Sequence, residues 1–247
     1  MARGLQEMNP LVSCTALPVT TSPETAVRDA VAATIPYTAV VMISPSLVRL
    51  KEVSDVVAEH GGCFFGGSLR GTLGWYFADL GEVYKYTIET TKPGSKPGDT
   101  DAERVVVEKE MKFTRLGDAL AGEAAQRSGP RRGRGVDLYP VLCALYAEEA
   151  AAVGSKSGPY GRWGDKGEGT GPSSLSASFE VARGTGSLYR EYVDEDESGL
   201  LAPALAAVLG GALGNDLTRT ISRRGEPNNN LTAFYVVDGQ LTVERRP

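Results

Sequence analysis

Histidine and cysteine are scarce in this chain of 247 residues, which has one histidine, His60, and three cysteines, Cys14, Cys63 and Cys143. A single histidine excludes any metal site that needs two histidine ligands. The cysteines are scattered and form no CxxC pair, so the sequence indicates neither a disulfide framework nor a zinc site. A reducing compartment is therefore the expected setting.

Long apolar runs and a strong positive charge are absent as well. No apolar run approaches the roughly 18 residues that a membrane helix needs, and the first nine residues are too polar for a signal peptide. The formal net charge of −5 argues against a nucleic-acid-binding protein. We therefore expect neither a membrane nor a nucleic acid as a partner.

Phosphate-binding glycine motifs are also missing. No P-loop occurs, and the glycines of residues 61–67 have the wrong order for a dinucleotide fingerprint, which needs GxGxxG between a strand and a helix. Gly210, Gly211 and Gly214 fall inside an expected helix. Turns explain the first group and close helix packing explains the second, so the sequence predicts no phosphate site and no cofactor bound by this chain alone.

His60 and Cys63 are close in sequence, but a catalytic thiol–imidazole pair needs both side chains in one cleft. A histidine at a helix end and a cysteine in a buried strand explain the same residues better. The sequence therefore predicts no catalytic residue.

Residues 201–239 are the stretch around which the chain is organised. Pro203 suits the first turn of a helix, and apolar residues recur at threes and fours over 204–222. The three glycines of this helix cost roughly 1 kcal/mol each relative to alanine. We expect another backbone, most simply that of the chain's own sheet, to approach the glycine face closely.

The end of this stretch predicts a hairpin. Gly225 and Pro227 end the helix, and residues 231–237 are rich in strand-forming residues. Asp238 and Gly239 form a strong hairpin turn that leads into a last strand.

The first third of the chain alternates strands and helices. We expect short strands at 11–17 and 63–65, helices at 24–33 and 45–60, and a strand at 39–43 whose continuous apolar run indicates burial on both faces. Such alternation favours βαβ units around a parallel sheet.

The middle of the chain has a different pattern. Strands are expected at 75–80, 85–89 and 104–113, with no helix between them, which indicates an antiparallel extension of the sheet. Helices are expected at 116–125 and 136–153. The fold class is therefore α/β.

Two polar stretches, about 91–103 and 154–174, are expected to be flexible loops because they contain too little apolar surface to offset ordering. The arginines at 127, 131, 132 and 134 could form a nuclear import signal or an anion-binding loop, and the acidic run 194–197 could bind a basic partner. Solvated surface is the simpler interpretation of both.

Four blocks, in this order, resemble the smaller, non-catalytic subunit of the SUMO-activating enzyme. They are LQEMNPLV at 5–12; FFGG at 64–67 with GTLGWYFADLGE at 71–82; the strand at 109–113; and the set Ala202-Pro203, Gly210-Gly211, Pro227, Asn229-Asn230 and Asp238-Gly239. The last block is the most specific. Asp79 stands where the family usually has asparagine.

The resemblance implies one domain over 1–247, an incomplete Rossmann-like fold of the ThiF type with three layers. Parallel strands come first, then antiparallel strands and a C-terminal helix with a hairpin. Compared with the family, the chain begins after the first strand, its glycine turn, a helix and the second strand. The arginine that this subunit supplies to its partner's ATP site belongs to that part, so no residue here inherits the role.

The resemblance also implies a function. This chain would be the structural half of a heterodimer that adenylates a SUMO-like modifier with MgATP and transfers it to a cysteine of the larger subunit, in the nucleus and cytoplasm. The family-motif residues expected to serve structure or the interface are Gly71, Phe77, Gly81, Pro203, Gly210, Gly211, Gly214, Asn229, Asn230, Asp238 and Gly239.

Two alternatives remain open. A stand-alone ThiF-like adenylating enzyme would need a nucleotide-binding glycine turn and acidic metal ligands, and neither is found in the sequence. A non-enzymatic binding module that kept the fold but lost the complex is the other. Co-purification of a larger subunit would favour the heterodimer over both.

Overall fold

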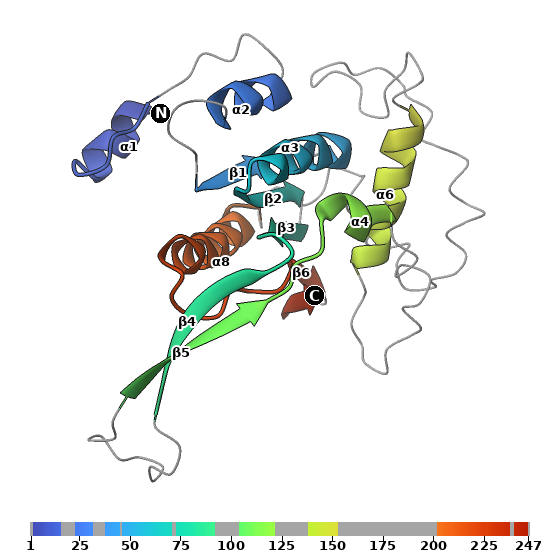
Figure 1. Ribbon diagram of the computed structural model, residues 1–247. Coiled ribbons are helices and arrows are strands. Elements are labelled where there is room, and N and C mark those ends of the chain that lie inside the picture. Colours follow the sequence, from blue (N-terminus) through green and yellow to red (C-terminus); the bar gives the residue numbers. More distant parts are fainter. Residues whose placement is uncertain are drawn as a thin grey trace.

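The computed structural model describes residues 2–15, 23–31, 38–44, 46–70, 73–91, 104–121, 138–152, 202–237 and 240–246. Within these residues helices cover a five-stranded sheet, and a separate two-stranded sheet extends away from it (Figure 1). The α/β class predicted from the sequence is confirmed.

One βαβ unit begins the sheet. Strand β1 (Ala39–Ile43), helix α3 (Leu47–Glu59) and strand β2 (Cys63–Arg70) follow one another, and β1 pairs with β2 in parallel. Ser46 starts α3 because its side chain accepts a hydrogen bond from the Arg49 amide. The predicted βαβ arrangement is therefore present.

The expectation that β1 is buried on both faces is wrong. Its only neighbour in the described sheet is β2, so β1 is an edge strand. Val41 is 43% exposed and Ile43 is 62% exposed on one face, while Val40 and Met42 pack against the core on the other. A continuous apolar run cannot by itself distinguish a central strand from an edge strand that is covered on one face.

The remaining strands of the main sheet are antiparallel. Strand β3 (Leu73–Asp79) lies between β2 and β6 (Leu231–Val237), and β7 (Gln240–Arg246) pairs with β6. The order is β1-β2-β3-β6-β7. The predicted C-terminal hairpin is confirmed by the pairing of β6 and β7, although its turn residues, Asp238 and Gly239, lie outside the described residues.

Strands β4 (Tyr84–Thr91) and β5 (Arg104–Met111) form their own antiparallel sheet rather than extending the main one. Near its base, the ring of Phe113 meets that of Tyr84 edge-on. The Tyr84 hydroxyl donates to the carbonyl of Thr220 at 2.7 Å. This bond connects the base of the two-stranded sheet, called the arm below, to the last turn of the long helix.

Helices cover both faces of the main sheet. On one face α3, α4 (Leu116–Ala121) and α6 (Tyr139–Ala152) pack on Phe64, Trp75 and Phe77. On the other face α8 (Ala202–Ser222) packs through Leu205 and Leu209 on Phe65, Tyr76 and Phe234. Figure 1 shows α8 across the sheet from α3 and α4. Since side chains alternate along a strand, neighbours such as Phe64 and Phe65 enter opposite cores.

The N-terminal part contains helices α1 (Ala2–Met8) and α2 (Pro23–Val31), and α2 lies close to the helix expected at 24–33. The strand expected at 11–17 is wrong over its described part, because Leu11–Thr15 forms a turn and irregular chain. Gln6 instead binds this loop with both ends of its side-chain amide, donating to the Val12 carbonyl and accepting from the Cys14 amide. The helix side chain therefore supplies contacts that a sheet neighbour would otherwise supply.

Several expectations concern residues outside the described ranges. These are the flexible loop at 91–103 beyond Thr91, the loop at 154–174, the four arginines between 127 and 134, the acidic run at 194–197 and the end of the helix expected at 116–125.

The close approach of the chain's own sheet, expected at the glycines of α8, is wrong. Gly210, Gly211 and Gly214 are exposed, and within the described residues nothing lies within 4 Å of the position that a side-chain β-carbon would take at any of them. The buried face of the helix is instead formed by Leu205 and Leu209. The sequence pattern located the helix but did not show which of its faces meets the sheet.

Replacing Gly214 with alanine should therefore stabilise the protein by about 0.5–1 kcal/mol, because alanine loses less backbone freedom in a helix and meets no neighbour here. Urea unfolding monitored by circular dichroism measures the change. A lower unfolding midpoint would show that a backbone does approach this face.

Candidate functional site

The carboxyl end of β3 is where residues of the two most specific motif blocks meet. Asn230, which is 2% exposed, donates from Nδ2 to the carbonyls of Ala78 at 3.0 Å and Thr114 at 2.9 Å. Its Oδ1 accepts from the Thr114 amide at 3.2 Å, and its backbone carbonyl accepts from the Ala78 amide at 2.7 Å. One residue thus joins β3, the segment before α4 and the start of β6.

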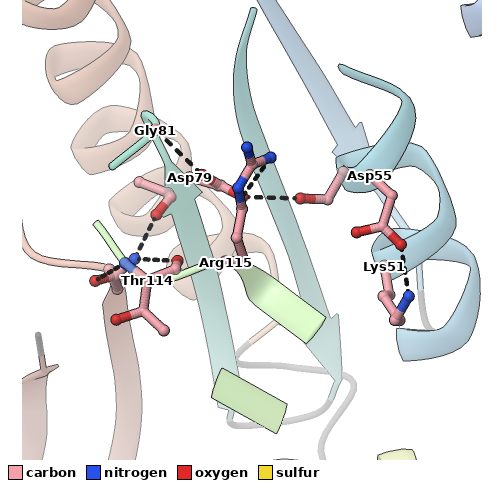
Figure 2. A network of polar contacts seen from close by, with 9 residues as sticks. Lys51, Asp55, Asp79, Gly81, Thr114 and Arg115 are labelled. Carbon is pink, nitrogen blue, oxygen red and sulfur yellow. Dashed lines mark hydrogen bonds and ion pairs between the residues drawn. The ribbon is translucent and has the colours of Figure 1, made fainter. Parts of the chain in front are cut away.

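Asp79 follows Ala78 as the last residue of β3, and its side chain is 2% exposed. Its carboxylate accepts from Ser54 Oγ at 3.3 Å and from the Gly81 amide at 3.2 Å, and Arg115 Nη1 lies 4.0 Å from it (Figure 2). Burial raises the pKa of Asp79, and the Gly81 amide and Arg115 oppose that rise only in part. A distance of 4.0 Å is too long for a hydrogen bond, which agrees with a carboxylate that remains costly to ionise.

Gly81 completes this turn. Its φ of 89° is in the left-handed region, which glycine adopts without strain. The Gly81 carbonyl accepts from the Phe113 amide at 3.3 Å, so the turn after β3 also meets the segment that leads to α4. A motif glycine therefore has a conformational role.

A second polar group lies beneath α8. Asp216 is fully buried and accepts from the Tyr76 hydroxyl at 3.2 Å and from the Asn228 amide at 2.8 Å. Asn228 Nδ2 donates to the Tyr76 hydroxyl at 2.7 Å. Burial, together with the neighbouring Asp216, raises the pKa of Tyr76 to about 12. The phenol therefore stays neutral and serves as a structural donor and acceptor.

The amino end of α3 is occupied by a carboxylate of the chain itself. Glu149 of α6, which is 4% exposed, accepts from Ser46 Oγ and from the Val48 amide, each at 3.1 Å. Helix amino ends bind anions through free N–H groups and the helix dipole. Here Glu149 fills that position and connects α6 to α3.

The other candidates predicted from the sequence are distributed through the fold. Phe77 is in the core beside α3 and α6, Pro203 is exposed in the first turn of α8, and Asn229 is half-buried in the turn before β6. Gly71, Asp238 and Gly239 lie outside the described residues. The structure brings together Gly81 and Asn230, but not the glycines of α8.

His60 lies at a helix end and Cys63 in a strand, as their simpler interpretation predicts, but Cys63 is half-buried rather than buried. His60 follows the last residue of α3, and its Nδ1 lies 2.8 Å from the Val56 carbonyl. Cys63 begins β2, and burial raises the pKa of its thiol. A raised pKa disfavours the reactive thiolate.

Asp216, Glu149, Ser54 and Arg115 are important residues that the sequence interpretation missed. Asp216 had a usable signal, because it lies seven residues after Leu209 and so falls on the buried stripe of α8. No sequence pattern pointed to Glu149 or Arg115, because the residues that they contact are distant in sequence.

No protein-family model matches this chain, and no curated protein matches it. Among the described residues no group of three or more His, Cys, Asp and Glu side chains could hold a metal ion, and no described helix is long and apolar enough to cross a membrane.

Replacing Asn230 with alanine should destabilise the protein by about 2–4 kcal/mol, because the buried carbonyl of Ala78 and the partly buried backbone groups of Thr114 lose their partners. Chemical denaturation provides the measurement. Asn229→Ala is the matched control, since the Asn229 side chain is half-buried in the same turn, and its effect should stay within about 0.5 kcal/mol. Equal effects of the two substitutions would show that the Asn230 contacts contribute nothing special.

Asp79→Asn should change the pH dependence of stability. Since the pKa of Asp79 is raised in the folded protein, folding is favoured at low pH and this contribution is lost as pH rises from about 4 through the folded-state pKa. The stability of the wild type minus that of Asp79→Asn should therefore fall as pH rises over this window. Urea unfolding at a series of pH values measures it, and a difference that grows with pH would contradict the assignment.

Proposed function

We propose that this chain is the non-catalytic structural subunit of a heterodimeric activating enzyme for a SUMO-like, ubiquitin-like modifier. The larger subunit would bind MgATP, adenylate the modifier and receive it on its catalytic cysteine. This chain would support that reaction without supplying a reacting group, in the nucleus and cytoplasm.

The observation that carries the proposal is the use made of the motif residues. Asn230, from the most specific block, forms its side-chain hydrogen bonds with backbone groups of Ala78 and Thr114, and Gly81 forms the turn beside them. Residues used in this way preserve a fold rather than contact a substrate. This is what a structural half of the heterodimer requires.

The contacts of Glu149 support the same proposal. A nucleotide-binding α/β protein commonly places a phosphate at a helix amino end that follows a strand. The helix α3 follows β1 in this way. Its amino end is already bound by Glu149, whose carboxylate accepts hydrogen bonds from the Val48 amide and the Ser46 hydroxyl. A stand-alone ThiF-like adenylating enzyme is therefore the weaker alternative.

The exposed face of α8 is the surface on which the larger subunit would bind. Ala204, Ala207, Gly210 and Gly211 are exposed, and Val208 is 40% exposed. The only charged residue between positions 203 and 218 is the buried Asp216. An uncharged helix face of small residues permits a partner's backbone to approach closely, which would offset the cost of its glycines.

Gly211→Leu should separate partner binding from folding. Because no atom of the described residues lies within 4 Å of the β-carbon position of Gly211, the melting temperature should stay unchanged or rise slightly. Binding to the larger subunit should weaken by about tenfold or more, because a leucine would occupy the place of the partner. Differential scanning fluorimetry and a titration with the purified larger subunit measure the two effects.

Gly4→Leu is the matched control, because Gly4 is also an exposed helical glycine with nothing within 4 Å. Loss of binding in both variants, or in neither, would remove α8 from the interface. Failure of any larger subunit with a catalytic cysteine to co-purify would contradict the heterodimer. ATP–pyrophosphate exchange by the isolated chain would favour the stand-alone enzyme instead.

A further inference from the structure

Three arginines gather at the carboxyl end of α8. Arg219 is in its last turn, and Arg223 and Arg224 follow its last residue; all three are exposed. Lys51, Arg104 and Arg115 each lie within ion-pair distance of a carboxylate. In the part of the chain that the structure describes, the three arginines of α8 have no such carboxylate.

Compensation of the helix dipole explains only the first of them. A cation in the last turn is favourable next to the carbonyls of a helix end, and Arg219 also donates from Nη1 to the Glu226 carbonyl at 3.4 Å. Arg223 has a φ of 53°, in the left-handed region where glycine or asparagine usually ends a helix. This conformation is not what helix stability alone would select for an arginine.

The backbone that carries these arginines is held firmly. The Thr87 amide donates to the Arg223 carbonyl at 2.9 Å, and the Gly225 amide donates to the Thr87 carbonyl at 2.8 Å. Thr87 Oγ1 also donates to the Arg223 carbonyl at 3.1 Å, which is the third hydrogen bond between the two segments. Residues 223–225 thus lie along the edge of β4 in parallel register, with Arg224 beside Thr87.

This anchoring also directs Arg223 toward the end of the main sheet. Its guanidinium is the largest influence that opposes the burial-driven rise in the pKa of Cys63, and it acts in the same direction on Tyr84. Arg223 therefore lies near the start of β2 and the base of the arm, while its side chain remains exposed.

We infer that Arg219, Arg223 and Arg224 bind an acidic segment of a protein partner. Guanidinium groups pair with carboxylates through two parallel hydrogen bonds, and three of them on a fixed backbone favour several carboxylates in succession. The uncharged face of α8 leads to these arginines, so a segment lying along the helix would be apolar first and acidic at this end. That the partner is the larger activating subunit rests on the proposed function; the acidic chemistry does not.

The test uses the full chain and a fluorescent twelve-residue peptide in which glutamates alternate with alanines. Its matched control peptide has glutamine in place of each glutamate. Fluorescence anisotropy at low salt should show binding of the acidic peptide and not of the neutral one, and binding should weaken as salt screens the charges. Equal affinity for both peptides would overturn the inference.

Substitutions locate the binding site. Arg223→Asn combined with Arg224→Gln should weaken the acidic peptide about tenfold, and asparagine suits the left-handed position. Lysine at both positions keeps the charge but loses the paired hydrogen bonds of a guanidinium, so it should restore only part of the affinity. Arg28→Gln with Arg49→Gln removes two exposed arginines elsewhere and should have no effect.

Equal weakening by the two double variants would show only a general charge effect and would contradict the site. Tighter binding of a single-stranded oligonucleotide at these arginines would assign the surface to nucleic acid instead.

The larger subunit separates the two proposals. If a complex forms and Arg223→Asn with Arg224→Gln weakens it in a salt-dependent way, both hold. If a complex forms regardless of these arginines and of salt, the acidic contact with that subunit is wrong and the heterodimer stands. If no complex forms but the acidic peptide binds at the arginines, the heterodimer is wrong and the acidic docking surface stands.

Discussion

The side chain of Asn230 satisfies backbone groups in two segments that no sheet or helix could otherwise serve. The carbonyl of Ala78 is buried and both backbone groups of Thr114 are partly buried, and a buried polar group without a partner is costly. The side-chain amide of asparagine carries two N–H donors and one oxygen acceptor, so it can bond to all three of these backbone groups. At this junction Asn230 thereby fixes Thr114, which lies two residues before α4 begins.

Other polar side chains repeat the same use of chemistry. Asp79 accepts hydrogen bonds from the Ser54 hydroxyl and the Gly81 amide. Asp216 accepts hydrogen bonds from the Tyr76 hydroxyl and the Asn228 amide. A buried carboxylate whose pKa is raised, as that of Asp79 is, can be a catalytic group or a structural one. Here the partners are groups of the same fold, which favours a structural role and is consistent with a subunit that supports a reaction carried out elsewhere.

The elements that sequence could predict are those whose signal is local. Ser46 and the apolar stripe of α3, the break at Gly225, and the strand-forming residues of β6 each determine structure within a few residues. The strand at 11–17 failed because a strand needs a neighbour, and Gln6 supplies the loop's hydrogen bonds instead. The glycine face of α8 was assigned to the sheet because small residues indicate close packing without indicating against what.

The junction itself could be predicted only in part. Asn230 and Gly81 were identified through the family resemblance, while Thr114, Ser54 and Arg115 were not. Their contacts with Asn230 and Asp79 join different elements of the chain, and such contacts leave no periodic pattern in the sequence. Similarly, the pairing of Glu149 with the start of α3 depends on where α6 docks. Such contacts follow from the fold, so they become visible only when the fold is known.

Native-state hydrogen exchange of the amides of Ala78 and Thr114 tests the central claim most directly. Both donate to Asn230, one to its backbone carbonyl and one to Oδ1. If Asn230 holds the junction, the Thr114 amide should exchange only on global unfolding, within about tenfold of the rate of the core amides of β3. If Thr114 instead exchanges as fast as the amide of Val83 in the nearby exposed turn, the junction opens independently and the fold does not depend on Asn230.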